Sequence, residues 1–208
     1  MIVSINSNKL IILICFFASF SFLSSCKSWE PIEMTNRENN KASKKLVNLK
    51  LNFQNIPLMT NDLLLNDERN ILLKEFENNL MDLKSDFYGY LEINRNIIDS
   101  KPGLGYTIPS VLLFSVPNIF GMPFLDIKQT TEIEVKILDK DGKLIEKYSA
   151  IGKGNVKVAY YYGYSLRIAN RKAYSDAIIN ALEQIRVKLE VDIDKINARL
   201  LKTGKINS

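Results

Sequence analysis

The sequence predicts an α+β fold, a two-layer sandwich in which a mainly antiparallel sheet is packed by two main helices. Three observations predict this class. Apolar and polar residues alternate, as in half-buried strands, in several separate stretches. A glycine-containing turn joins two of these stretches, and alanines recur every four residues near the carboxyl end. Helices separated by antiparallel strands favour one layer of strands and one of helices.

The first strand is expected within residues 46–56, and a helix is expected to follow at about 67–84. The strand alternates Leu49, Leu51 and Phe53 with polar residues. Either Asn66 or Asp67 can cap the helix. Its apolar face, at three- and four-residue steps, carries Leu72, Phe76, Leu80 and Leu83.

Further strands are expected at 87–95, 127–138 and 144–152. Asp141-Gly142 lies between the last two, and glycine accepts the positive φ that a tight hairpin requires. The run 155–164 either extends this sheet or leads into the final helix.

The final helix is expected to begin near Ser165, a good capping residue, and to run to about Lys188. A row of small side chains lets a helix approach a sheet closely, so this helix should lie on the sheet. A shorter helix is expected at about 192–202. The row consists of Ala169, Ala173, Ala177 and Ala181.

The amino terminus has the layout of a secretory signal: Lys9, an apolar core over 10–23, and then small residues. The core of about 14 residues is short of the roughly 20 that a membrane-spanning helix needs. Leu23-Ser24-Ser25-Cys26 resembles the signal of bacterial lipoproteins, in which a leucine and two small residues precede an invariant cysteine.

This resemblance implies cleavage between Ser25 and Cys26 and attachment of acyl chains, of the palmitate type, to Cys26. It also implies sorting to the outer membrane, because Lys27 stands where an acidic residue marks inner-membrane retention. The alternatives are an ordinary signal peptide with a chance cysteine or an uncleaved anchor. The expected organisation is a signal peptide at 1–25, a lipidated cysteine with a polar tether at 26–45, and a single domain at 46–208.

The composition narrows the classes of function. Without residues 1–25 the chain has 183 residues, 27 basic and 23 acidic, a scattered excess of about four positive charges. The sequence has no basic patch with interleaved aromatic residues, so we do not expect nucleic-acid binding. The sequence contains no histidine, which excludes a Ser-His-Asp triad and a histidine-ligated zinc. We therefore expect no catalytic site, metal or cofactor.

The element order and the closing alanine-rich helix of the mature domain are similar to those of small α/β domains in envelope lipoproteins and to the amino-terminal domain of TolB. No sequence motif carries this second resemblance, which covers the arrangement of elements alone.

Residues 102–125 form the most unusual segment, because 24 consecutive positions hold no charge but four prolines and three glycines. Prolines at this frequency prevent a regular transmembrane helix. One interpretation is a surface that contacts a membrane or an envelope protein. The other is a loop folded over the core, with a short strand at 110–116. The candidate contact residues are Val111, Leu112, Leu113, Phe114, Ile119 and Phe120.

The tyrosine-rich run 159–164 places Tyr160 and Tyr162 on one strand face. Tyrosine combines apolar area with a hydroxyl and suits recognition surfaces. These two residues are therefore further candidates for partner contact, against the alternative of core or edge packing.

The sequence as a whole predicts a lipid-anchored envelope protein with a non-catalytic binding or assembly role. The alternatives are a structural subunit of a multi-protein envelope complex, docked through 102–125, and a histidine-independent hydrolase acting on lipid or cell wall.

Overall fold

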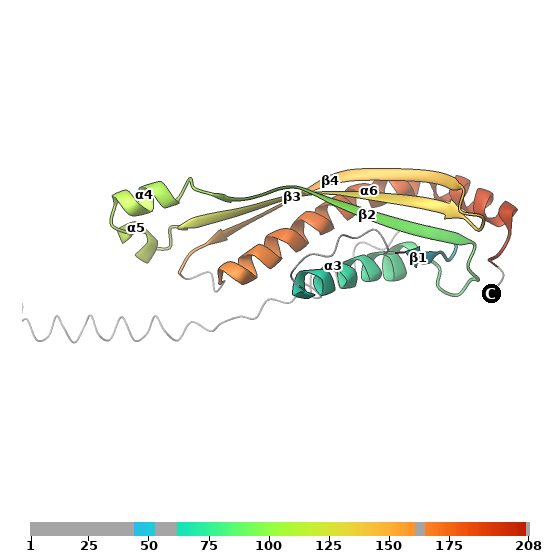
Figure 1. Cartoon of the computed structure of the whole chain (residues 1–208), viewed down its shortest axis with the longest axis horizontal. Helices are drawn as coiled ribbons and strands as arrows, with labels where there is room; N and C mark the ends of the chain where they lie inside the picture. The colour runs from blue at the N-terminus through green and yellow to red at the C-terminus, as the bar shows by residue number, and fades with distance from the viewer. Residues whose placement is uncertain (1–43, 53–61, 161–164, 207–208) are drawn as a thin grey trace, which may run out of the picture.

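A computed structural model describes residues 44–52, 62–160 and 165–206 of the chain. Its four-stranded sheet has the order β1-β2-β3-β4, and the long helix α6 crosses one face with α3 beside it (Figure 1). The strands are β1 (Lys50–Asn52), β2 (Gly89–Gly103), β3 (Leu125–Asp139) and β4 (Leu144–Val158). The helices are α3 (Asp62–Lys74), the π-helix η2 (Glu75–Leu80), α4 (Thr107–Leu112), α5 (Val116–Ile119) and α6 (Leu166–Thr203).

The predicted α+β class is confirmed. The β2–β3 and β3–β4 pairs are antiparallel, whereas the short edge strand β1 runs parallel to its neighbour β2. The predicted hairpin is also confirmed, with Gly142 at a φ of 78° and the Asp139 amide donating to the Lys143 carbonyl at 2.9 Å.

Apolar and polar residues alternate along the strands, which gives the sheet one apolar face and one polar face. Inward side chains such as Leu91, Ile133 and Val135 join the core beneath α6 and α3, whereas the opposite face is polar. On that polar face Glu134 accepts from Lys147 at 2.6 Å and from Lys136 at 3.2 Å. Chiefly through the Lys147 hydrogen bond, these lysines lower the pKa of Glu134.

The alanine row of α6 lies where the sheet has glycines, as the close-approach prediction requires. A Cβ added at Gly152 would come 1.8 Å from the Ala177 carbonyl oxygen, and one at Gly154 would come 1.8 Å from that of Ala173. The helix backbone therefore packs directly against the backbone of β4. This contact fixes the position of α6 along the sheet, since larger residues on either side would force the two layers apart.

The helix predicted over 67–84 begins earlier, at Asp62, and ends at Leu80, so neither Asn66 nor Asp67 is its cap. Leu72, Phe76 and Leu80 are fully buried as expected, but Leu83 is exposed. The backbone is already extended at Met81 (φ −105°, ψ 151°), which removes Leu83 from the helical face.

The helices expected at 165–188 and 192–202 are one continuous helix of 38 residues. Residues 189–191 hold neither glycine nor proline, so nothing in the backbone ends the helix there. The Ser165 cap is confirmed, because its hydroxyl accepts from the Ile168 amide at 3.3 Å.

The strands also differ in length from the predictions. β1 covers only three residues, and residues 53–56 of the predicted first strand lie outside the described residues. The second strand continues beyond residue 95 to Gly103, and the run from residue 155 extends β4 as far as Val158. Residues 1–43 also lie outside the described ranges, so the signal, cleavage and tether boundaries stay predictions.

Candidate functional site

The uncharged segment forms a separate lobe at one end of the molecule. The helices α4 and α5 lie beyond the ends of β2 and β3, at the opposite end from the chain terminus marked C (Figure 1). We call residues 104–124 the apolar tip. It is tied to the sheet by the Phe124 amide, which donates to the Val158 carbonyl at 2.9 Å, and by the Thr107 hydroxyl, which donates to the Phe124 carbonyl at 3.0 Å.

All six side chains predicted as contacts in this segment are exposed. Phe114 is 91% exposed and Phe120 is 85% exposed. The interpretation of a loop folded over the core is therefore wrong. The sequence prediction missed three further exposed apolar residues of the same uncharged run: Leu104, Ile108 and Val116.

Polar side chains occupy the interior of the apolar tip. Ser110 is 5% exposed and its hydroxyl donates to the Tyr106 carbonyl at 2.6 Å. Asn118 is 1% exposed and its Nδ2 donates to the carbonyls of Met122 (2.9 Å) and Pro123 (3.2 Å). The tip thus buries two polar side chains while its large apolar side chains face outward, the reverse of the arrangement in the rest of the domain.

A strained turn presents the outermost side chain. Phe114 and Ser115, between α4 and α5, have φ values of 50° and 61°. Non-glycine residues rarely adopt this left-handed region. Strain of this kind persists only where surrounding contacts hold it, here including a 2.7 Å hydrogen bond from the Ser115 amide to the Ser110 carbonyl.

The short strand considered at 110–116 is absent, and α4 with the following turn occupies this stretch. Pro109 and Pro117 lie in the first turns of α4 and α5, where a proline removes no helical hydrogen bond. The prolines that exclude a long helix therefore permit two short ones.

Of the two candidate tyrosines, Tyr160 is exposed and its ring centroid lies 5.6 Å from that of Phe124, at the base of the apolar tip. Tyr162 lies outside the described residues.

Lysines surround the base of the apolar tip. Lys101 and Lys128 are paired across β2 and β3, and Lys157 lies 5.5 Å from the centre of the Tyr106 ring. Asp126 lies at the same level of the sheet and is buried. Its partner Lys128, at 3.4 Å, is itself 61% exposed.

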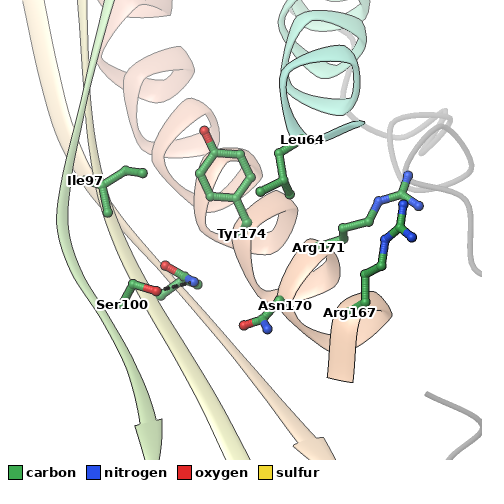
Figure 2. Close-up of a pocket in the computed structure, with 8 residues that line it drawn as sticks. Leu64, Ile97, Ser100, Arg167, Asn170, Arg171 and Tyr174 are labelled. Atoms are coloured by element: carbon green, nitrogen blue, oxygen red, sulfur yellow. Dashed lines mark hydrogen bonds between the residues drawn. The ribbon is translucent and has the colours of Figure 1, made fainter. Parts of the chain in front are cut away.

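A second feature is a pocket of about 620 Å³ between the start of α6, α3 and the strands β2 and β3 (Figure 2). Its lining combines apolar, polar and cationic side chains. The lining residues are Leu64, Ile97, Ser100, Gln129, Arg167, Asn170, Arg171 and Tyr174.

A buried polar network holds Tyr174 in this wall. The Tyr174 hydroxyl donates to Glu68 Oε2 at 2.6 Å and accepts from Arg95, whose Nε lies 3.3 Å from Glu68 Oε1. Burial, opposed by Tyr174 and Arg95, raises the pKa of Glu68. Burial and the neighbouring Glu68 also raise the pKa of Tyr174, so the hydroxyl stays protonated.

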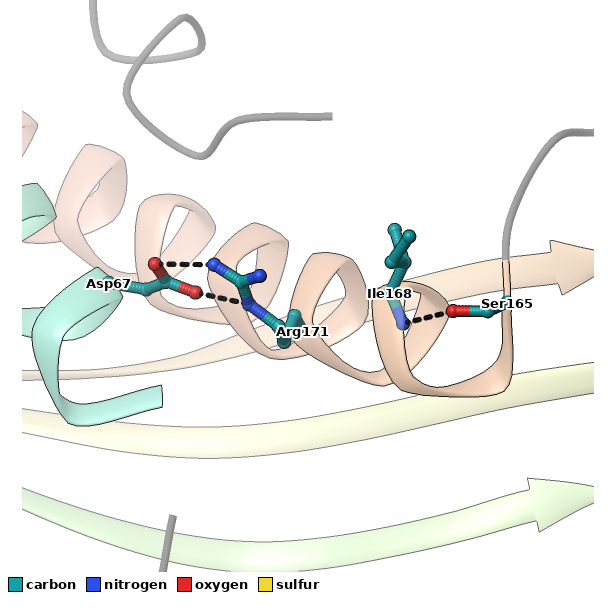
Figure 3. Close-up of polar contacts among 4 residues, drawn as sticks. All are labelled: Asp67, Ser165, Ile168 and Arg171. Atoms are coloured by element: carbon teal, nitrogen blue, oxygen red, sulfur yellow. Dashed lines mark hydrogen bonds and ion pairs between the residues drawn. The ribbon is translucent and has the colours of Figure 1, made fainter. Parts of the chain in front are cut away.

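Arg171 is held by a two-point ion pair. Its Nε and Nη2 donate to the carboxylate of Asp67 at 2.7 and 2.8 Å, in the second turn of α6 after the Ser165 cap (Figure 3). This geometry fixes the guanidinium plane. Sequence reasoning missed the pocket, because its residues come from four elements far apart in the chain.

The predicted lipidation and cleavage residues, Cys26 and Ser25, lie outside the described residues. Among the helices that the structure describes, none is both long enough and apolar enough to cross a bilayer. Within the same residues, no three acidic, cysteine or histidine side chains gather as a metal site.

Comparison with known proteins assigns no family to this chain. No protein-family model matches the chain, and no curated protein matches it. Among solved structures, a protein from Caulobacter crescentus described as a "putative lipoprotein" matches with a TM-score of 0.35 and 14% identity, covering 73% of this chain and 90% of that one. A likeness this low assigns neither a family nor a function to this chain.

Proposed function

We propose that this chain is a lipid-anchored protein of the bacterial envelope with a non-catalytic role, and that its apolar tip forms a second contact with the membrane. Cys26 is the proposed attachment point of the acyl chains. Lys27 favours the outer membrane as the destination.

The inverted arrangement of the apolar tip is the observation that supports this role most strongly. Large exposed apolar patches mark interaction sites, and nine exposed apolar side chains gather in the tip. Fully burying one leucine or phenylalanine side chain contributes roughly 1.5–3 kcal/mol, so several of these residues together favour insertion. A bilayer suits a surface whose large exposed side chains are apolar and whose buried Ser110 hydroxyl and Asn118 Nδ2 bond to nearby carbonyls, because hydrocarbon offers no hydrogen-bond partners.

The charges at the base of the tip support a bilayer over a protein partner. The strand ends at 99–103, 125–130 and 153–158 carry four lysines and two aspartates, a local excess of positive charge. Anionic lipid head groups attract lysines near the surface by about 1 kcal/mol each. An apolar lobe with lysines at its base therefore matches the hydrocarbon and head-group layers in turn.

The anchor and the tip can rest on one bilayer. Residues 27–45 reach at most roughly 60 Å when extended. The helix α6, at about 1.5 Å per residue, spans about 57 Å. The tether can therefore reach a distance similar to the length of α6, which favours both contacts on one bilayer.

Metabolic labelling with an alkyne fatty acid tests the anchor. We expect incorporation that is lost in Cys26→Ser and kept in Cys15→Ser, because Cys15 lies inside the signal. Label that persists in Cys26→Ser would contradict the proposed attachment point.

Crosslinking in intact cells tests the tip, with a photoreactive residue at Phe114 and a control at Ile151, which is about half exposed on the outer sheet face. Crosslinks to lipid from position 114 alone are expected. A reproducible protein adduct at position 114 would contradict membrane contact and favour the alternative of a subunit in an envelope complex.

A further inference from the structure

We infer that the pocket at the start of α6 binds a small organic carboxylate carrying an apolar side chain and a peptide group, of which the free carboxyl end of a short peptide is the simplest example. This inference is independent of the apolar tip, because none of the lining residues belongs to it.

Two arginines supply the charge that a carboxylate requires. Arg167 and Arg171 come from consecutive turns of α6, on the other side of the pocket from Ile97 and Ser100, and their guanidinium groups extend toward the α3 side (Figure 2). Asp67 offsets the charge of Arg171 but occupies only Nε and Nη2 of its guanidinium group. Among the described residues no hydrogen bond or ion pair holds Arg167, which leaves its positive charge for a ligand. The amino-terminal turns of a long helix add to the positive potential.

An unpaired amide on the strand side points independently to a ligand. Gln129 is only 8% exposed, its Nε2 donates to the Ser100 hydroxyl at 2.7 Å, and its Oε1 has no partner among the described residues. Exchanging the amide oxygen and nitrogen would leave the nitrogen unpaired instead. A peptide group satisfies either orientation, since it contains both an N–H donor and a carbonyl acceptor. A buried amide atom without a partner is unfavourable, so an occupant that pairs with it is stabilised.

The remaining walls suit an apolar side chain. Leu64 and Ile97 line the pocket, and the Tyr174 ring presents its apolar surface because Glu68 and Arg95 already engage its hydroxyl. The volume falls within the range of small-molecule sites, about 300–1,000 Å³. Carboxylate, peptide group and apolar side chain thus each have a matching wall.

Photolabelling of the full lipidated chain in nanodiscs of neutral lipid tests this inference. The probe is N-acetyl-photoleucine, a diazirine analogue of leucine. We expect adducts on peptides that line the pocket, displaced by N-acetyl-leucine. The neutral N-acetyl-leucinamide should compete about tenfold less well or worse, because it lacks the charge that the arginines bind.

Surface variants keep the test free of folding effects. Arg167→Gln and Asn170→Asp, both at exposed positions, should each reduce the competed labelling about tenfold, by removing a positive charge or adding a negative one. Arg69→Gln, an exposed arginine of α3 outside the pocket, should label as the unmodified protein does.

Three results would overturn the inference: equal competition by the acid and the amide, full labelling of Arg167→Gln, or no competed adduct in the pocket. Adducts confined to residues 104–124 would report partition onto the apolar tip and would also count against the pocket.

Discussion

The sheet with its covering helices, which we call the body, and the apolar tip differ in which side chains they bury. Over the body, β2, β3 and β4 turn apolar side chains toward α6 and polar ones toward solvent. In the apolar tip, Ser110 and Asn118 are buried while Phe114 and Phe120 face outward. The outer face of the sheet is suited to water, whereas the exposed apolar side chains of the tip support the proposed contact with an apolar surrounding. Substitutions should therefore be costly to stability in the body and costly only to association in the tip.

Breaking the buried ion pair of the body should have the largest effect. Arg95→Leu leaves Glu68, 2% exposed, without its cationic partner, and we expect a loss of about 4 kcal/mol in the free energy of unfolding. Urea unfolding followed by circular dichroism measures it. Lys147→Leu removes a partner of Glu134 on the solvated face and should cost less than about 1 kcal/mol. Equal losses in the two variants would mean that the Arg95 network is solvated.

Disrupting the contact between α6 and β4 should have the second-largest effect on stability. Gly154→Ala places a Cβ 1.8 Å from the Ala173 carbonyl oxygen, and we expect a loss of about 3 kcal/mol as the layers separate. The same substitution at Gly105, in the tip, meets nothing within 4 Å and should change stability by less than about 0.5 kcal/mol. A mild effect at residue 154 would contradict the direct backbone packing of α6.

Capping gives a smaller contrast between the two regions. Ser165→Ala removes the hydrogen bond to the Ile168 amide and should cost about 1 kcal/mol in thermal or urea unfolding. Ser115 stands at the same position before α5 but makes no side-chain cap, so Ser115→Ala should cost less than about 0.5 kcal/mol. A larger loss at residue 115 than at residue 165 would reverse the expected order.

The smallest effect on stability is expected at the exposed end of the tip. Phe114→Asp should change the free energy of unfolding by less than about 0.5 kcal/mol, because aspartate tolerates a positive φ better than phenylalanine does. Vesicle binding by the tip should nevertheless fall sharply, whereas Ile151→Asp on the outer sheet face should preserve it. A variant at residue 114 that unfolds would show the side chain to be structural.

Local patterns were enough to predict much of the fold. Alternation predicted the strand at 127–138, glycine predicted the hairpin at residue 142, and the alanine row predicted the close approach of α6. Helix ends were less predictable. No residue type marks the end of η2 before Leu83, and a continuous α6 depends on packing along its whole length.

The two candidate sites also differ in how far the sequence predicts them. The apolar tip is contiguous in sequence, so its lack of charge is visible in the chain. Its inversion was not predictable, because it depends on the side chains of Ser110 and Asn118 bonding to nearby backbone carbonyls. The pocket joins residues about 100 positions apart, such as Leu64 and Arg167, and only the tertiary structure brings them together.

Depth-dependent quenching tests the membrane contact of the apolar tip most directly. With Cys15 removed in the signal and Cys26 acylated, Phe114→Cys supplies a single free thiol for an environment-sensitive fluorophore on the lipidated protein in vesicles. Ile151→Cys is the matched control. If the tip enters the bilayer, acyl-chain nitroxides will quench the fluorophore at residue 114 and not at residue 151. Quenching at residue 114 by aqueous iodide, with none by the lipid nitroxides, would contradict membrane contact by the tip.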